Sequence, residues 1–566
     1  MAGFKIIMYF QPQKQGYNLF APGYKTQGII FFLCILGFSY FTSITIGKVF
    51  QEISVGAIGR MILYCLAVAS LLSMTKNLKV GRIKRMIAFP QINSINFLFI
   101  LVLLLAAAPP LINIFKLFSP LVLIVSIFVI GSAVLSIYSI LNDKLFKALI
   151  IFIFNLPLLC FLEWQLGSTG SEWVISGPLV FTPTILYLMS MFFSYLLSDK
   201  KDDQIELSGL SASSLILLAA VIISVFISNN IYLSSKMALF QYFYPLIFFY
   251  LLLKALHNID QIKALLLSLV IFGIIYSFFG FYSVLGMSVP TFDKLNLLYG
   301  ETGLAQSLRI IATLLLPFAT AMAISYTGVK KAGSIVAVLL NLLFVVAGFS
   351  RIALLGAVFS FMPFLEKRKI PILIIGAGLS ALLFHGWFAG NVLVRFKEFD
   401  ALEKLDMYYW SPMRLWGIQG AIGIFKDYPI FGIGYGMWDD YYYKYGPALY
   451  FGTGIAYIRA AHNTFLDMAV QGGIVMLAAL IGFLAVFLKE CLSLIFNAKD
   501  IFTKNIALGC LGFFILILVV SFAGNVFSFA TLNDISIGVV FWSVVAILIA
   551  LRKINKKQSE MEKSPC

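Results

Sequence analysis

The chain has 566 residues, of which 61% are hydrophobic and only 12% are charged, and its mean hydropathy is +0.96. Soluble domains carry about 25% charged and about 45–50% apolar residues, so this composition excludes a soluble globular protein and indicates a polytopic membrane protein. The formal net charge is +16, but the basic residues lie in short loops between apolar runs. This distribution follows the positive-inside bias of membrane proteins, and we expect no nucleic acid partner.

The apolar runs predict an all-α membrane protein with about 14–16 transmembrane helices. Before residue 290 we expect spans at Gln27–Gly47, Val55–Met74, Ser94–Ile114, Leu117–Leu141, Leu145–Trp164, Gly177–Ser198, Leu210–Ser228, Ala238–Leu253 and Ala264–Met287. After residue 290 we expect Ile310–Tyr326, two short spans within Ser334–Leu365, then Ile370–Gly390, Phe465–Leu488, Ile506–Phe527 and Ile535–Leu551.

Clusters of Lys and Arg beside the span ends set the predicted orientation. They place both termini in the cytoplasm and a large polar loop, residues 391–461, on the outer face, which is the periplasm in a double-membrane bacterium. We divide the chain into a cytoplasmic tail (1–26), an N-terminal transmembrane bundle (27–290), a C-terminal transmembrane region (291–551) and a second cytoplasmic tail (552–566).

The run Ser334–Leu365 is too long for one helix that crosses a hydrocarbon core of about 30 Å. Ser350 and Arg351 lie in its middle, so two short spans that turn at this pair fit better, with Arg351 at the outer surface. The positive-inside rule does not require an arginine there, which favours a functional residue over a topology marker. Arg309, just inside the outer end of a span, follows the same logic.

Within the outer loop, Ser411 and Pro412 form a helix start and Pro429 ends the segment. Leu415, Ile418, Ala421, Ile422 and Phe425 recur between them at helical spacing, which predicts a helix along the membrane surface. Arg414 lies in its first turn, where free N–H groups and a guanidinium could bind an anion such as a diphosphate. The alternative is an interfacial arginine whose side chain reaches to the headgroups.

His462 precedes a long apolar run directly after the polar loop. A helix N-terminus disfavours the imidazolium, so we expect a neutral ring that could accept a proton from a sugar hydroxyl. Asn463 beside it is a candidate helix cap. The other two histidines, His257 and His385, are expected to be a surface residue and a packing residue.

The outer loop is rich in aromatic residues, among which Trp410, Trp438 and Tyr441 are candidates for glycan contact. An interfacial aromatic belt is the alternative for each of them. The sequence contains no phosphate-loop motif, no Asp-x-Asp pair and no histidine pair at metal-ligand spacing. Its six cysteines form no CxxC pair. We therefore expect no metal and no cofactor.

Several of these segments, taken together, resemble the O-antigen ligase and O-antigen polymerase superfamily. The resemblance covers about the C-terminal half, from Gly300 to Phe487, and rests on Ser350-Arg351, on Arg414 with Asp427-Tyr-Pro-Ile-Phe-Gly-Ile-Gly434, on His462-Asn463 and on Gly472-Gly473.

The resemblance implies a GT-C-like helical fold and a metal-independent, inverting transfer of a glycan from undecaprenyl diphosphate to an acceptor hydroxyl. It implies that Arg351, Arg414 and Arg309 bind the diphosphate and that His462 activates the acceptor. The acceptor would be a growing glycan or lipid A-core, and a polymerase would also suggest a chain-length regulator as partner.

The chain is longer than a typical ligase and has extra N-terminal spans, so the acceptor stays open among lipid A-core, a repeat unit and a protein. A lipid-linked glycan flippase or exporter is an alternative of another class, and a structural partner in an envelope assembly is a third. A flippase would keep its cations in a central cavity, whereas the candidates here gather on the predicted outer side.

Overall fold

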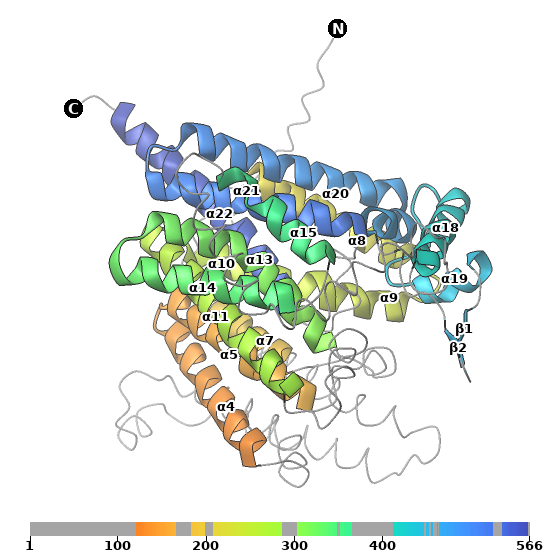
Figure 1. Ribbon diagram of the computed structural model, residues 1–566, viewed down its shortest axis with the longest axis horizontal. Helices are drawn as coiled ribbons and strands as arrows, with labels where there is room; N and C mark the ends of the chain where they lie inside the picture. Colours follow the sequence, from red (N-terminus) through yellow and green to blue (C-terminus); the bar gives the residue numbers. More distant parts are fainter. Residues whose placement is uncertain are drawn as a thin grey trace, which may run out of the picture. The chain divides into compact units, whose positions relative to one another are not determined.

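A computed structural model of the chain describes residues 120–165, 183–197, 208–285, 303–347, 351–364, 411–446, 449–451, 454–456, 461, 463–523 and 535–563. The chain divides into two compact units, residues 1–109 with 177–179, and residues 110–176 with 180–566. All the described residues belong to the second unit (Figure 1). The spans predicted at Gln27–Gly47, Val55–Met74, Ser94–Ile114 and Ile370–Gly390 lie outside the described residues.

The described part of the chain is almost entirely helical. Its elements are α4 (Pro120–Leu141), α5 (Leu145–Gln165), α7 (Pro183–Leu197), α8 (Gly209–Ile227), α9 (Ile231–Ala238), the π-helix η2 (Leu239–Phe243), α10 (Tyr244–Ala255), α11 (Ile259–Leu285), α13 (Gly303–Ser325), α14 (Gly328–Ala347), α15 (Arg351–Ser360), the 3-10 turn η3 (Met362–Phe364), α18 (Ser411–Asp427), α19 (Trp438–Tyr445), β1 (Leu449–Phe451), β2 (Gly454–Ala456), α20 (Thr464–Asn497), α21 (Ile501–Ala523) and α22 (Ile535–Lys563). The two short strands pair antiparallel.

Seven helical segments among the described residues are long and apolar enough to cross a membrane, and four shorter apolar helices accompany them. This confirms the predicted class, an all-α polytopic membrane protein. The predicted total of spans stays a prediction, since residues 1–119 and 365–410 are outside the description. Most predicted spans within the described residues coincide with a helix, but several helices are longer than predicted. Helix α11 begins at Ile259 rather than Ala264, α13 at Gly303 rather than Ile310, and α21 at Ile501 rather than Ile506. Helix α20 continues to Asn497, and α22 continues to Lys563, through most of the predicted tail.

The predicted turn at Ser350-Arg351 coincides with a change of helix. Helix α14 ends at Ala347 and α15 begins at Arg351, with residues 348–350 outside the description. Helix α15 has 10 residues, which corresponds to about 15 Å of helix and about half of a hydrocarbon core. Arg351 is therefore the first residue of a helix that is too short to cross the membrane alone.

One hydrophobic core joins the described helices on both sides of residue 290. A continuous cluster of buried residues runs from Val129 in α4 to Leu551 in α22. Helix α20 packs along both α8 and α21, as Figure 1 shows, and α10 packs against α22. The described helices of the predicted N-terminal bundle, α4 to α11, thus share their core with the helices that carry the candidate site.

The loops that follow the predicted spans ending at Leu253, Tyr326 and Leu488 meet at one end of this bundle. The alternation of the predicted spans puts all three loops in the cytoplasm. The Nζ of Lys263, near the start of α11, lies 5.3 Å from the ring centroid of Phe502, near the start of α21. Phe502 also stacks on Tyr326, in the turn between α13 and α14, with 6.1 Å between centroids. Asn505 donates to the Ser325 hydroxyl over 3.1 Å. We call this meeting point of the three loops, which contains Lys263, Ser325, Tyr326, Phe502 and Asn505, the α21 start.

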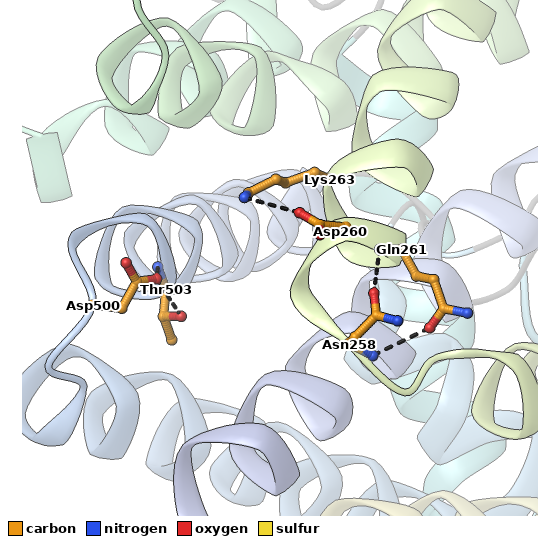
Figure 2. A network of polar contacts seen from close by, with 6 residues as sticks. All are labelled: Asn258, Asp260, Gln261, Lys263, Asp500 and Thr503. Atoms are coloured by element: carbon orange, nitrogen blue, oxygen red, sulfur yellow. Dashed lines mark hydrogen bonds and ion pairs between the residues drawn. The ribbon is translucent and has the colours of Figure 1, made fainter. Parts of the chain in front are cut away.

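Local hydrogen bonds cap the first turns of α11 and α21 at the α21 start (Figure 2). The Asn258 Oδ1 accepts from the Gln261 N–H over 2.9 Å, and the Gln261 side chain accepts from the Asn258 N–H, which is the reciprocal arrangement of a capping box. Asp500 accepts from both the N–H and the hydroxyl of Thr503, over 2.8 and 2.9 Å. The ion pair between Lys263 and Asp260 is exposed, so it adds little stability.

Candidate functional site

The predicted surface helix of the outer loop exists with the expected ends. Helix α18 spans Ser411–Asp427, so it begins at the predicted Ser-Pro start and ends just before Pro429. Within the predicted apolar stripe, Ala421 is buried, as is its neighbour Ile424, whereas Ile422 is exposed. Glycines let partner side chains approach the buried face: an added Cβ at Gly420 would lie 2.6 Å from the Tyr442 ring. That the stripe lies along the membrane surface stays a prediction.

After α18, residues 429–436 form a loop that inserts into a break in α20. We call residues 429–436 the glycine loop. In an unbroken helix the N–H groups of Ile474 and Val475 would donate to the carbonyls of Val470 and Gln471. Here they donate instead to Pro429 O over 2.8 Å and Ile430 O over 3.4 Å.

The carbonyls released by this break are also satisfied by the glycine loop. Val470 O accepts from the Ile433 N–H over 2.9 Å, and Gln471 O accepts from the Gly434 N–H over 3.0 Å. The Gln471 side chain accepts a further bond from the Gly436 N–H over 2.9 Å. The loop therefore replaces two helical hydrogen bonds with four backbone–backbone bonds and one bond to the Gln471 side chain, which leaves these backbone groups satisfied inside the protein.

Glycines make this insertion sterically feasible. Gly473 at the break has φ 64° and ψ −161°, a conformation that is essentially restricted to glycine. A Cβ there would lie 2.1 Å from Ile430 O, and one at Gly432 would lie 2.4 Å from Val470 O. The motif Asp427–Gly434 and the pair Gly472-Gly473, singled out separately in the sequence, are thus two sides of one contact.

The start of α20 carries the predicted cap. The Asn463 Oδ1 accepts from the Leu466 N–H over 3.1 Å, and the Asn463 Nδ2 donates to Phe522 O over 3.2 Å. The first bond satisfies a free N–H of α20, and the second ties this helix to the C-terminal end of α21. His462, the residue before the cap, lies outside the described residues.

Replacing Asn463 with alanine is expected to lower the free energy of unfolding by about 1 kcal/mol, because an N-cap and a tertiary bond are lost. Thermal unfolding in detergent measures this. Asn497→Ala at the other end of α20, where the exposed amide makes only a 3.5 Å bond to Ser493, is the matched control and should have little effect. Equal melting temperatures for the two variants would contradict the capping role.

The helices that carry Arg309 and Arg351 reach the same end of α21 as Asn463. Helices α15 and α21 run antiparallel, since Gly356 approaches Val520 while Gly512 approaches the Ser360 carbonyl. This register brings the start of α15, at Arg351, level with the C-terminal end of α21.

Helix α13 has the same register. Its residue Ala321 lies against Gly509 and Pro317 lies against Gly512, so its N-terminal part with Arg309 extends toward the C-terminal end of α21. We call this end, with Asn463 bonded to Phe522, the α21 terminus. It lies opposite the α21 start, where the loops predicted as cytoplasmic meet.

Helix α18 joins this assembly through the start of α20. A second buried cluster contains Ala421, Ala461 and Val470, with Trp416 and Leu466 packed against it. Arg414 therefore lies two residues before Trp416, which packs against the cluster that contains Ala461, the residue before His462. Figure 1 shows α18 and α19 beside the N-terminal end of α20. The side chains of Arg309, Arg351 and Arg414 are outside the description, so their placement rests on the backbone.

The aromatic side chains predicted to contact glycan are buried where the structure describes them. Trp438 stacks on Tyr442 at 5.5 Å between centroids, and Tyr441 packs edge-on against Tyr428 and accepts a hydrogen bond from Asn229. Both Trp438 and Tyr441 are less than 8% exposed. They form part of a buried core between α18 and α19, and their contact with glycan stays a prediction. Trp410 is outside the description.

A buried polar cluster beneath the glycine loop was not singled out in the sequence. Tyr435 donates to the Gln241 side chain on the π-helix η2, and its ring meets Tyr242 edge-on at 5.6 Å. Burial raises the pKa of Tyr435 well above its usual range, and Tyr242 and the nearby Asp467 act in the same direction. The tyrosine is therefore a neutral donor. Polar residues inside apolar spans, such as Gln241 and Asp467, were the signal that could have identified the cluster.

The comparisons with known proteins bear on the same segments. Residues 336–481 match the family model described as O-antigen ligase (Wzy_C). The match includes α15, α18, the glycine loop and the break in α20, and therefore the positions of Arg351, Arg414 and His462, but not Arg309. No curated protein sequence matches the chain.

Proposed function

We propose that this membrane protein, whose residues 336–481 match the O-antigen ligase family, transfers a glycan from undecaprenyl diphosphate to an acceptor hydroxyl. The transfer would take place at the outer face of the bacterial inner membrane. The observation that carries the proposal is that the helix ends bearing Arg309 and Arg351 lie level with the α21 terminus, where the residue after His462 is bonded. Residues 336–481, which include Arg351, Arg414 and His462, match a glycan-transferring family.

In the proposed reaction, Arg351, Arg414 and Arg309 bind the donor diphosphate. Arg351 begins α15 and Arg414 lies in the first turn of α18, so free helix N–H groups add to the positive potential at both positions. Neutralising the diphosphate makes it a good leaving group without a metal ion. The three cations and two helix ends are all contributed by this one chain.

His462 would act as the general base. It accepts the proton of the acceptor hydroxyl while the oxygen forms a bond to the anomeric carbon, and the carbon–oxygen bond to the diphosphate breaks. The bonding electrons leave with the diphosphate, and attack from the opposite side inverts the anomeric configuration. The cap at Asn463 and the contact with Phe522 hold the residue after His462 against α21.

A transfer assay with purified protein in detergent tests this proposal. The donor is a labelled undecaprenyl-diphosphate oligosaccharide, offered alone, with lipid A-core or with a candidate acceptor protein. A ladder from the donor alone indicates a polymerase, whereas one new product that requires lipid A-core or protein indicates a ligase or a protein glycosyltransferase. Movement of the donor across liposomes without a new glycosidic bond would instead support the flippase.

Substitution of the arginines tests the donor site. Arg351→Ala and Arg414→Ala are each expected to weaken donor binding by about 2–5 kcal/mol, because each removes a cation from a desolvated charge pair. A binding titration with the labelled donor measures the loss. Lys553→Ala is the matched control. Lys553 is exposed on α22 beside Arg552, which pairs with Glu490 in the C-terminal part of α20, far from the proposed donor site. Unchanged affinity in both arginine variants would contradict the diphosphate assignment.

A further inference from the structure

Asp467 is a buried carboxylate that the proposed reaction does not use. It lies in the first turns of α20, within a helix apolar enough to span a membrane, and its side chain is 1% exposed. Burying a charge in such a segment costs several kcal/mol, so a charged residue there has to be compensated by specific contacts. Those contacts point to what the residue does.

The carboxylate of Asp467 folds back onto the segment that contains His462. Its Oδ1 accepts from the Ala461 N–H over 2.9 Å, and its own N–H donates to Asn463 O over 2.9 Å. Ala461 is fully buried, so its N–H has no access to water as an alternative partner. The peptide before His462 is thus held by Asp467, and the residue after it is held by the helix cap.

Asp467 also connects this segment to the buried polar cluster. Tyr435 of the glycine loop lies near Asp467, and its hydroxyl donates to the Gln241 side chain on η2. One helical turn further along α20, Gln471 accepts from the Gly436 N–H. A π-helix inside an otherwise regular span is frequently found at functional sites. The glycine loop therefore bonds to both η2 and α20, the helix that carries this carboxylate five residues after His462.

We propose that Asp467 is a positioning residue that sets the backbone at His462 for reaction with the acceptor hydroxyl. The inference rests on the proposed function, in which His462 is the base. Removing the carboxylate would free the Ala461 N–H and let the base move relative to the donor. A displacement of about 1 Å can lower a rate by about 10²-fold.

Three variants test this role. Asp467→Ala is expected to lower kcat by about 10–100-fold with the donor KM changed by less than about threefold, because the candidate diphosphate ligands are on other helices. Asp467→Asn keeps an oxygen acceptor and should recover most of kcat. Asp467→Glu keeps the charge but moves it by one methylene group, so it should lower kcat and leave the KM unchanged. Asn505→Ala, which removes a buried side-chain bond at the α21 start, is the matched control.

Hydrogen exchange gives a readout that does not depend on activity. The peptide spanning residues 457–466 should exchange faster in Asp467→Ala than in the wild type, and at the wild-type rate in Asn505→Ala. Three outcomes would overturn the inference while leaving the proposed function standing. They are a wild-type kcat in Asp467→Ala, an effect of Asp467→Ala on KM alone, and a kcat in Asp467→Asn as low as in Asp467→Ala. If the wild type transfers no glycan, the proposed function fails, and unchanged exchange in Asp467→Ala would then separately overturn the contact with the His462 segment.

Discussion

His462→Ala is expected to lower the transfer rate by about 10²–10⁴-fold, the usual contribution of a general base, while donor binding stays near the wild-type value. Loss of the imidazole removes the group that accepts the hydroxyl proton, but it removes no cation from the proposed diphosphate site. Single-turnover transfer with saturating labelled donor measures the chemical step, and a donor titration measures binding.

The chain offers a matched control for this substitution. His257 is exposed in the loop before α11, at the α21 start, and only its backbone N–H makes a described contact, to Gln261. His257→Ala should therefore transfer glycan at the wild-type rate. A full rate in His462→Ala would show that this residue is not the base. A joint loss of rate and donor binding, with a lowered melting temperature, would show a folding defect instead.

Helix boundaries in the outer loop could be predicted because the signals are local. Ser411 and Pro412 favour a helix start and Pro429 cannot continue a helix, so the bounds of α18 follow from a few neighbouring residues. The change of helix at Arg351 follows equally from the length of an apolar run compared with the membrane. The cap at Asn463 depends only on residues three positions away.

The contacts that assemble the candidate site could not be predicted because they join residues distant in sequence. The sequence does not show that Gly473 has to be a glycine, because the atom that excludes a Cβ there belongs to Ile430, which is 43 residues away. The density of aromatic residues in the sequence does not distinguish an exposed glycan-binding surface from a buried core. In the structure Trp438 and Tyr441 are buried, and the Tyr442 ring packs closely against Gly420 of α18. The partner of Asp467 is only six residues away, but it lies before the start of the helix, where helical spacing predicts no contact.

Gly473→Ala is expected to be the most destabilising single substitution between α18 and the break in α20, lowering the free energy of unfolding by about 3 kcal/mol or more. The conformation at φ 64° and ψ −161° costs a residue with a Cβ about 1–3 kcal/mol. That Cβ would also lie 2.1 Å from Ile430 O and would have to displace the glycine loop. Each loop hydrogen bond lost adds about 0.5–1.5 kcal/mol. Thermal unfolding in detergent measures the change.

Gly482, on the same helix, separates strain at the break from a general effect of replacing glycine in α20. No atom lies within 4 Å of a Cβ built there, and alanine is favoured over glycine in a helix by about 1 kcal/mol. Gly482→Ala should thus leave stability unchanged or raise it. Because α18 is held to α20 through the glycine loop, Gly473→Ala should also abolish transfer even in the fraction that stays folded. Wild-type stability together with wild-type transfer in Gly473→Ala would mean that the loop does not position Arg414 relative to His462.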